Sequence, residues 1–144
     1  MLRKQEAIQA YTPYALAALR IVTAYLFIQH GTAKLFGFPH QSMFDGLELF
    51  SLIGLAGVLE VAGGLLIGVG LFTRSTAFVM SGFMAVAYFM AHAPQGYVLA
   101  PMLNGGEVAA LYSFIFLLFV FAGAGALSLD GRKQRDTKPT LVTA

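Results

Sequence analysis

Residues 50–72 have the sequence FSLIGLAGVLEVAGGLLIGVGLF, in which Glu60 is the one ionisable side chain. About 20 predominantly apolar residues let a helix cross the hydrocarbon core of a bilayer. Three further apolar stretches, separated by segments containing Gly, Pro or polar residues, occupy 14–36, 76–91 and 106–127. Helices are expected because lipid cannot hydrogen-bond free backbone groups, and the alternating pattern of a membrane barrel is absent. We therefore predict an all-α membrane protein with the architecture of a four-helix transmembrane bundle.

The composition agrees with this fold class. The 144 residues are 58% hydrophobic and 11% charged, with a mean hydropathy of +0.73, whereas soluble domains carry about 25% charged residues. The absence of cysteine excludes disulfides, cysteine nucleophiles and thiolate metal sites. The net charge of +2 comes from a few Lys and Arg near the ends, so we expect a lipid bilayer as partner and no nucleic acid.

The basic residues are distributed unevenly between the connections. The segments 37–49 and 92–105 contain neither Lys nor Arg. The basic residues outside the spans lie in the N-terminal segment, the second connection and the tail, at Arg3, Lys4, Arg74, Arg132, Lys133, Arg135 and Lys138. Because cytoplasmic loops are enriched in Lys and Arg, both N and C termini are predicted to be cytoplasmic. The domains are then a cytoplasmic segment 1–13, a transmembrane domain 14–131 and a basic cytoplasmic tail 132–144.

Four ionisable side chains lie within the first two spans. Arg20, His30 and Lys34 belong to the first span and Glu60 belongs to the second. Such groups are costly in lipid and require a partner, a cavity or access to the interface. His30 and Lys34 share a face because they are four residues apart.

Two pairings of Glu60 are open at this point. Because consecutive spans are antiparallel, Glu60 is expected near the level of residues 25–27, within reach of both Arg20 and His30. An Arg20–Glu60 ion pair and a His30–Glu60 hydrogen bond are both open. A pair with Arg20 would be structural; in the alternative, Glu60 has a functional role and handles protons or orients a ligand. Gly57, Gly64 and Gly68 share the Glu60 stripe, and small residues let another helix approach, so Glu60 is expected to face protein.

Further polar residues border the same side as the connections without Lys or Arg. His92, Asn104 and Glu107 lie at the ends of the third and fourth spans, and with His30 and Lys34 they are predicted to form a polar outer vestibule. Simpler roles are also open: Lys34 can extend to the interface, and Asn104 and Glu107 can cap the fourth helix. Two histidines without a supporting pattern are a weak signal, so we expect neither a metal site nor haem.

Several short motifs, in this order and spacing, resemble the DoxX family of bacterial integral membrane proteins over roughly residues 14–131. They are Leu19-Arg20-Ile21, His30-Gly31-x-x-Lys34, Leu59-Glu60-x-x-Gly63-Gly64, Asn104-Gly105-Gly106-Glu107 and Gly123-x-Gly125-x-x-Ser128-Leu129-Asp130. The resemblance implies a multi-pass protein with four helices in the bacterial cytoplasmic (inner) membrane. Some relatives are linked to quinone reduction as a subunit of a thiosulfate:quinone oxidoreductase, and others to redox homeostasis with soluble enzymes.

Two functions from different classes follow. In the first, the chain is a quinone-associated or redox-linked membrane subunit acting with soluble or membrane redox partner proteins. His30 and Lys34 would bind a quinone carbonyl and Glu60 would handle protons, in an apolar pocket lined by Tyr25 and Phe27. In the second, it is a non-catalytic scaffold or interaction protein whose buried ion pair is structural. A homo-oligomer is compatible with both hypotheses.

Overall fold

The computed structural model describes the backbone of residues 2–136 and the side chains of residues 6–133, and this part of the chain is helical without strands. The longer helices are α1 (Leu2–Gln9), α2 (Thr12–Phe36), α3 (Leu52–Val69), α4 (Thr73–Ala87), α5 (Glu107–Ala122) and α6 (Leu129–Asp136). Short elements complete the connections: η1 (Ser42–Phe44), the π-helical η2 (Tyr88–His92) and η3 (Ala93–Gln95).

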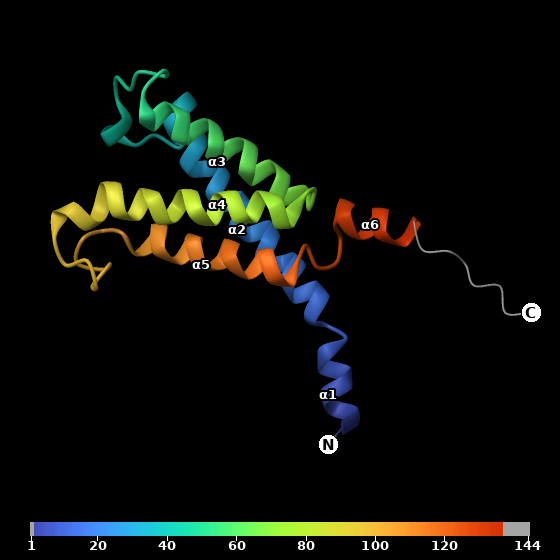
Figure 1. The fold of residues 1–144 in the computed structure, drawn as a ribbon. Helices are drawn as coiled ribbons and strands as arrows, with labels where there is room; N and C mark the ends of the chain where they lie inside the picture. The colour runs from blue at the N-terminus through green and yellow to red at the C-terminus, as the bar shows by residue number, and fades with distance from the viewer. Residues whose placement is uncertain (1, 137–144) are drawn as a thin grey trace, which may run out of the picture.

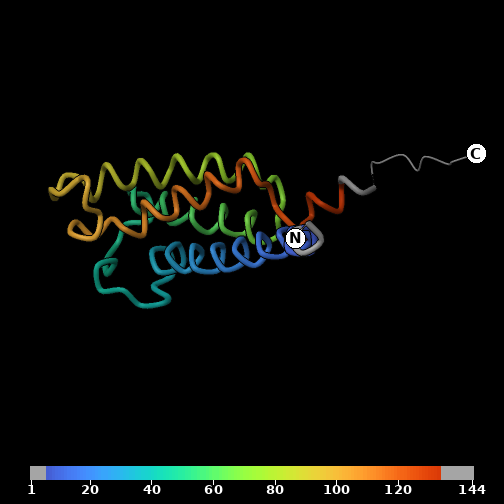
Figure 2. The backbone as a smooth tube through the Cα atoms, turned by 90° about the horizontal axis from the view of Figure 1, so that it is seen from below, coloured from blue at the N-terminus to red at the C-terminus, as the bar shows by residue number. Residues whose placement is uncertain are grey.

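The four longest helices form two antiparallel hairpins that pack against each other, α2 with α3 and α4 with α5 (Figures 1 and 2). The connections 37–51 and 93–106 lie at one end of the molecule, which we call the loop end. The tight turn between α3 and α4 lies at the other end, together with α1 and α6, and we call this the termini end (Figure 1).

Three helical stretches are long and apolar enough to cross a membrane, namely Glu6–Phe36, Leu52–Val69 and Thr73–Gln95. The fourth predicted span is shorter than expected, because α5 ends at Ala122 and not near residue 127. Gly123 and Gly125 adopt φ values of 79° and 68°, which take the chain out of the helix. The chain then enters α6, a helix that the sequence analysis did not predict.

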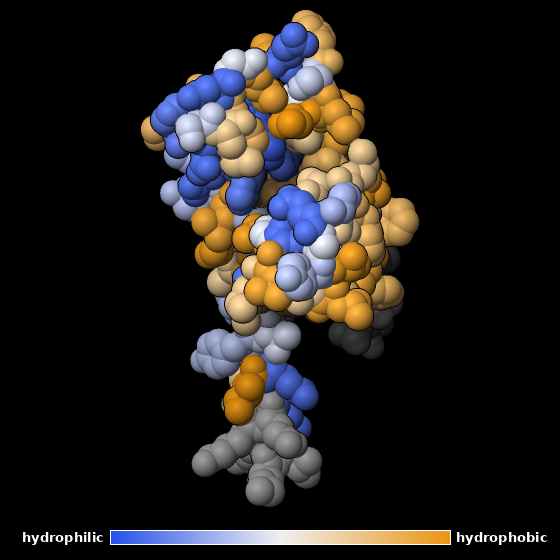
Figure 3. All heavy atoms as spheres, turned by 90° about the vertical axis from the view of Figure 1, so that its left-hand side faces the viewer, coloured by the Kyte–Doolittle hydropathy of each residue, from blue (hydrophilic) through white to orange (hydrophobic). Residues whose placement is uncertain are grey.

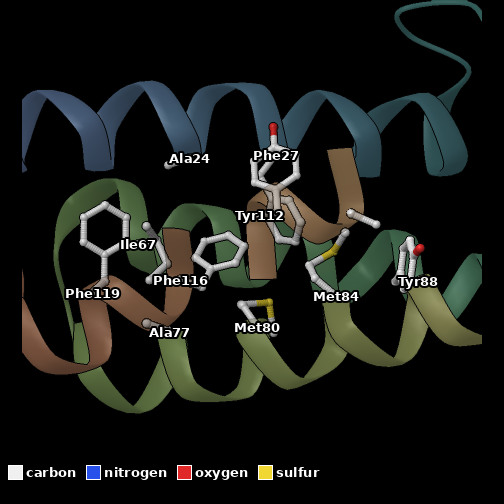
Figure 4. Packing of buried hydrophobic residues seen from close by; sticks show 11 residues of the cluster. Ala24, Phe27, Ile67, Ala77, Met80, Met84, Tyr88, Tyr112, Phe116 and Phe119 are labelled. Carbon is white, nitrogen blue, oxygen red and sulfur yellow. The ribbon is translucent and has the colours of Figure 1, made fainter. Parts of the chain in front are cut away.

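Aromatic side chains fill the space between the hairpins (Figure 4). The buried ring of Phe27 on α2 contacts two rings of α5, with centroids 4.9 Å from Phe116 and 5.2 Å from Tyr112. Met80 and Met84 pack into this cluster from α4, and Ile67 from α3. The core therefore joins all four long helices.

Glycines set how closely α2 and α3 approach. A Cβ atom added to Gly31 would lie 2.7 Å from the carbonyl oxygen of Gly57, and one added to Gly64 would lie 2.6 Å from Ile28 Cγ1. Side chains larger than hydrogen would force the helices apart. The prediction that the stripe of Glu60 faces protein is confirmed, because Glu60 is buried on the same side as these glycines.

The exterior is apolar along the helices and mixed at the loop end. Large hydrophobic side chains are exposed on every long helix, for example Ile21, Leu55, Phe78 and Phe114. Figure 3 looks onto the loop end, where hydrophilic residues gather in patches among hydrophobic ones. An apolar exterior around an apolar core is the surface of a membrane protein.

Candidate functional site

The ion pair that Lys34 forms with Glu60 joins α2 to α3 near the loop end. Lys34 Nζ lies 2.6 Å from both Oε1 and Oε2 of Glu60. The two side chains are 13% and 6% exposed, so the charges satisfy each other within the protein. A shielded, bidentate pair of this kind is the arrangement that makes ionisable groups tolerable in a membrane helix.

Both pairings expected for Glu60 are wrong, because its partner is Lys34 and neither Arg20 nor His30. The cause is the register of the two helices. Helix α3 begins at Leu52, two residues later than predicted, so Glu60 lies closer to the loop end. Gly31 lies against Gly57 and Val61, and Lys34 is therefore within reach of the carboxylate.

His30 lies one helical turn from Lys34, exposed at the surface beside α5. Its ring meets the ring of Tyr112 edge-on, with centroids 5.9 Å apart. Within residues 6–133, no side chain or backbone group forms a hydrogen bond with the His30 imidazole. The Tyr112 ring is buried and its hydroxyl is directed toward α2 (Figure 4). Tyr112 was not among the predicted site residues, although a tyrosine among the phenylalanines of an apolar helix is a signal that could have indicated it.

The expected pocket between Tyr25 and Phe27 is not formed. Phe27 is fully buried in the core, whereas Tyr25 is 65% exposed on the surface of α2. The two residues are separated by about 200° around a helix, so their side chains point in different directions. The polar surface beside His30 is instead bordered by Tyr112.

The connection 37–51 covers Lys34 on the loop side. The Phe44 ring lies 5.4 Å from Lys34 Nζ, a cation–π contact. A hollow of about 330 Å³ separates this connection from α2, and its walls include Lys34, Gln41, Phe44 and Asp45. The ion pair thus borders a small, partly polar space at the loop end.

His92, Asn104 and Tyr88 form a second polar group at the loop end. Asn104 is buried and its Nδ2 donates to the Tyr88 hydroxyl at 3.1 Å, while its Oδ1 accepts from the backbone N–H of Gly106 at 2.9 Å. His92 Nδ1 lies 3.2 Å from the Asn104 carbonyl oxygen. Asn104 therefore organises the connection 93–106 up to Gly106, which is the N-cap residue of α5. No side-chain hydrogen bond caps this helix, so the predicted capping role of Asn104 is wrong.

The structure divides the predicted vestibule into these two groups. In the described part of the chain, no hydrogen bond or ion pair links Lys34 or Glu60 with His92 or Asn104. Glu107 is exposed in the first turn of α5, where a negative charge suits the helix dipole. Within residues 6–133, no three His, Asp or Glu side chains come close enough together to hold a metal ion.

Arg20 has a different role from the one predicted, at the termini end. It is fully buried, and its five N–H groups point to five backbone carbonyls. Nη1 donates to Ile67 at 2.7 Å and to Gly68, at the end of α3. Nε and Nη2 donate to the segment after α5, at Ala124 (2.9 Å), Ala126 (3.4 Å) and Leu127 (2.9 Å). Arg20 thus binds carbonyls at helix ends and joins α2 to the end of α3 and to the segment after α5.

Asp130 caps α4 from a distant part of the chain. Its Oδ1 and Oδ2 accept the backbone N–H groups of Phe72 (2.9 Å) and Thr73 (2.8 Å). Partial burial of Asp130 opposes its ionisation, but hydrogen bonds from Thr73 and Phe72 and the positive charge of Arg20 outweigh it. The pKa of Asp130 therefore lies below its usual value. Sequence analysis had no role for this residue beyond its place in a family motif.

The comparison with known families identifies the family. The family model described as DoxX matches residues 15–93, which is more than half of the chain and includes most of α2 and all of α3 and α4, with the Lys34–Glu60 pair. The chain belongs to the DoxX family. A relative from Haemophilus influenzae, described as an uncharacterized protein, is 50% identical over 127 residues, covering 87% of this chain and 95% of the relative. No solved structure matches this DoxX protein.

Proposed function

We propose that this DoxX-family protein crosses the bacterial inner membrane four times, with both termini in the cytoplasm. Three helices are long and apolar enough to cross a membrane, and α5 runs beside α4 as a fourth apolar helix of 16 residues. Helices α1 and α6 lie at the termini end, where α4 begins with Thr73 and Arg74 (Figure 1). The basic sequence there and the absence of Lys and Arg from 37–51 and 93–106 support a cytoplasmic termini end and an outward-facing loop end.

Within this topology, we propose that the protein is a membrane subunit that binds the headgroup of a quinone-like lipid beside His30. The observation that carries this proposal is an exposed imidazole in a membrane helix, without a hydrogen-bonding partner in the described residues and one turn from a buried ion pair. An imidazole N–H suits a carbonyl oxygen, and Tyr112 offers an aromatic edge to a planar ring.

Lys34 and Glu60 would act beside this ligand. Lys34 has three N–H groups, and two of them meet Glu60, so one remains for a ligand oxygen. Glu60 is the carboxylate placed to exchange a proton with Lys34 or with the ligand. Since the chain contains no cysteine, we propose that a soluble or membrane redox partner supplies electrons to the ligand.

Co-purification with native lipid tests this function. Wild type extracted in mild detergent is expected to carry quinone, and His30→Ala is expected to lose it while retaining its elution volume and helicity. Tyr25→Ala removes an exposed ring from another part of the α2 surface and serves as a matched control. Wild type free of quinone, or equal quinone in His30→Ala and wild type, would contradict the proposal.

A non-catalytic scaffold is the second candidate, and the pairing of the buried charges favours it. Arg20 meets five carbonyls and Lys34 meets both oxygens of Glu60, so these contacts hold helices together without a ligand. In that case Arg20 and Glu60 substitutions lower the folded yield, whereas His30→Ala leaves the cellular phenotype unchanged. Loss of the phenotype in a normally folded His30→Ala protein would exclude the scaffold.

A further inference from the structure

Helix α5 is too short to cross the bilayer unaided. Its 16 residues extend about 24 Å, compared with about 30 Å of hydrocarbon. The termini end of α5 is held in place, because Arg74 Nη1 donates to the carbonyls of Val120 (2.7 Å) and Phe121 (2.8 Å). The missing length therefore falls at the loop end, where the connection 93–106 precedes the helix.

The connection 93–106 has the side chains of a lipid-facing element. It contains no charged residue, and Tyr97, Leu99 and Met102 are 67%, 99% and 74% exposed. The other loop-end connection differs, since it carries an exposed His40–Asp45 pair at 3.6 Å and Glu48. Exposed apolar side chains without charges favour the boundary between lipid headgroups and acyl chains.

The backbone of this connection is also suited to a medium with little water. Several of its carbonyls accept hydrogen bonds from within the protein: Tyr97 accepts from Ala100 N at 2.7 Å, and Val98 accepts from the Tyr88 hydroxyl at 2.6 Å. Asn104 Nδ2 donates to Gly96 (3.3 Å) and Tyr97 (3.4 Å). Irregular backbone is tolerated near lipid where its polar groups are satisfied by protein.

From these observations we infer that residues 97–103 insert into the outer leaflet, at the boundary of headgroups and acyl chains, and complete the crossing begun by α5. The inference rests on the proposed four-span topology. Glu107, exposed in the first turn of α5, limits the depth, because its carboxylate must reach the headgroups. The insertion is therefore shallow, and it has no preference for lipid charge since the segment is uncharged.

The absence of tryptophan allows a direct test, since the tryptophan fluorescence of a variant with one introduced Trp comes from that position alone. Leu99→Trp would be reconstituted in phosphatidylcholine vesicles whose acyl chains carry bromine either near the headgroup or near the chain end. Phe114→Trp, at an exposed position on α5, is the reference for a residue within the membrane span. Met43→Trp, in the connection 37–51, is the reference for a residue exposed to water. Helicity and elution volume confirm folding of each variant.

Leu99→Trp is expected to emit at shorter wavelength than Met43→Trp and to lose emission mainly with bromine near the headgroup. Phe114→Trp should be quenched mainly by deep bromine. Emission and quenching of Leu99→Trp equal to those of Met43→Trp, with Phe114→Trp quenched, would overturn the inference and leave the four-span topology in place. Unquenched Phe114→Trp would show that α5 does not cross, so that the proposed topology fails as well.

Discussion

Lys34 Nζ lies 2.6 Å from both carboxylate oxygens of Glu60, so the two membrane-buried charges neutralise each other between α2 and α3. Each charge is tolerated in its apolar surroundings because the other is present. The pair also borders the exposed ring of His30, and any ligand of that ring would meet a neutral pair and not an isolated charge. Structural and functional roles of the pair therefore depend on the same contact.

Removing one member of this pair is expected to destabilise the protein more than removing both. Glu60→Gln leaves the Lys34 ammonium without its counter-charge, which costs roughly 3–5 kcal/mol for a buried pair. In the double variant Lys34→Met/Glu60→Leu no charge remains, and the free energy of unfolding should return to within about 1–2 kcal/mol of wild type. Unfolding in detergent, followed by circular dichroism, measures Glu60→Gln and also the cycle of wild type, Lys34→Met, Glu60→Leu and their double variant.

The matched control for this cycle is Asp45→Asn, an exposed carboxylate in the connection 37–51. Its effect is expected to be within about 0.5 kcal/mol. A double variant destabilised by the sum of the two single values would mean that Lys34 and Glu60 contribute independently.

Even the conservative substitution Arg20→Lys is expected to destabilise the protein. The guanidinium donates to five carbonyls of three segments, whereas an ammonium has three N–H groups and a different geometry. Arg20→Lys leaves at least two buried carbonyls without a donor, at about 1–3 kcal/mol each. Thermal unfolding in detergent should show a lower midpoint for Arg20→Lys and no change for the exposed Arg132→Lys. A midpoint equal to wild type would show that the hydrogen bonds lost in Arg20→Lys are dispensable.

Much of this architecture follows from composition, but the pairings do not. The apolar runs predict the long helices because bilayer thickness fixes their length. The partner of Glu60 depends on helix register, which the contact of Gly31 with Gly57 and the start of α3 determine. The cap of α4 by Asp130 was missed because caps are sought within a few residues, and Asp130 lies 57 residues beyond Thr73. The partner expected for Arg20 was the carboxylate of Glu60, because backbone carbonyl acceptors cannot be recognised in a sequence.

The cap formed by Asp130 is expected to make stability depend on pH in the acid range. The pKa of Asp130 in the folded protein is below its usual value of about 3.8. The carboxylate therefore stabilises the fold above that value, and this contribution is lost as pH falls through the folded pKa. Asp130→Ala should cost about 0.5–2 kcal/mol at pH 7, the range for lost caps, and its difference from wild type should shrink below about pH 4.

The free energy of unfolding of wild type and Asp130→Ala, measured at several pH values between neutral and strongly acid, tests whether the difference shrinks as the pH falls. Asp45→Ala is a suitable control, since that carboxylate is exposed and accepts no backbone N–H group among the described residues. A difference between Asp130→Ala and wild type that stays constant as the pH falls would contradict the capping role of the ionised carboxylate.

Cysteine labelling can test the four crossings, because the natural chain has no cysteine to remove. Single cysteines at Met43 and Gln95, in exposed positions at the loop end, are expected to react with a membrane-impermeant maleimide on intact cells. Cysteines at Ser75 and Arg132, at the termini end, should react after the cells are permeabilised, because the basic end is retained in the cytoplasm. Gln95 and Arg132 lie on either side of α5, so their contrast reports the short fourth span directly. Labelling of both positions on intact cells would mean that α5 does not cross, and the chain would then have three crossings with its C-terminus outside.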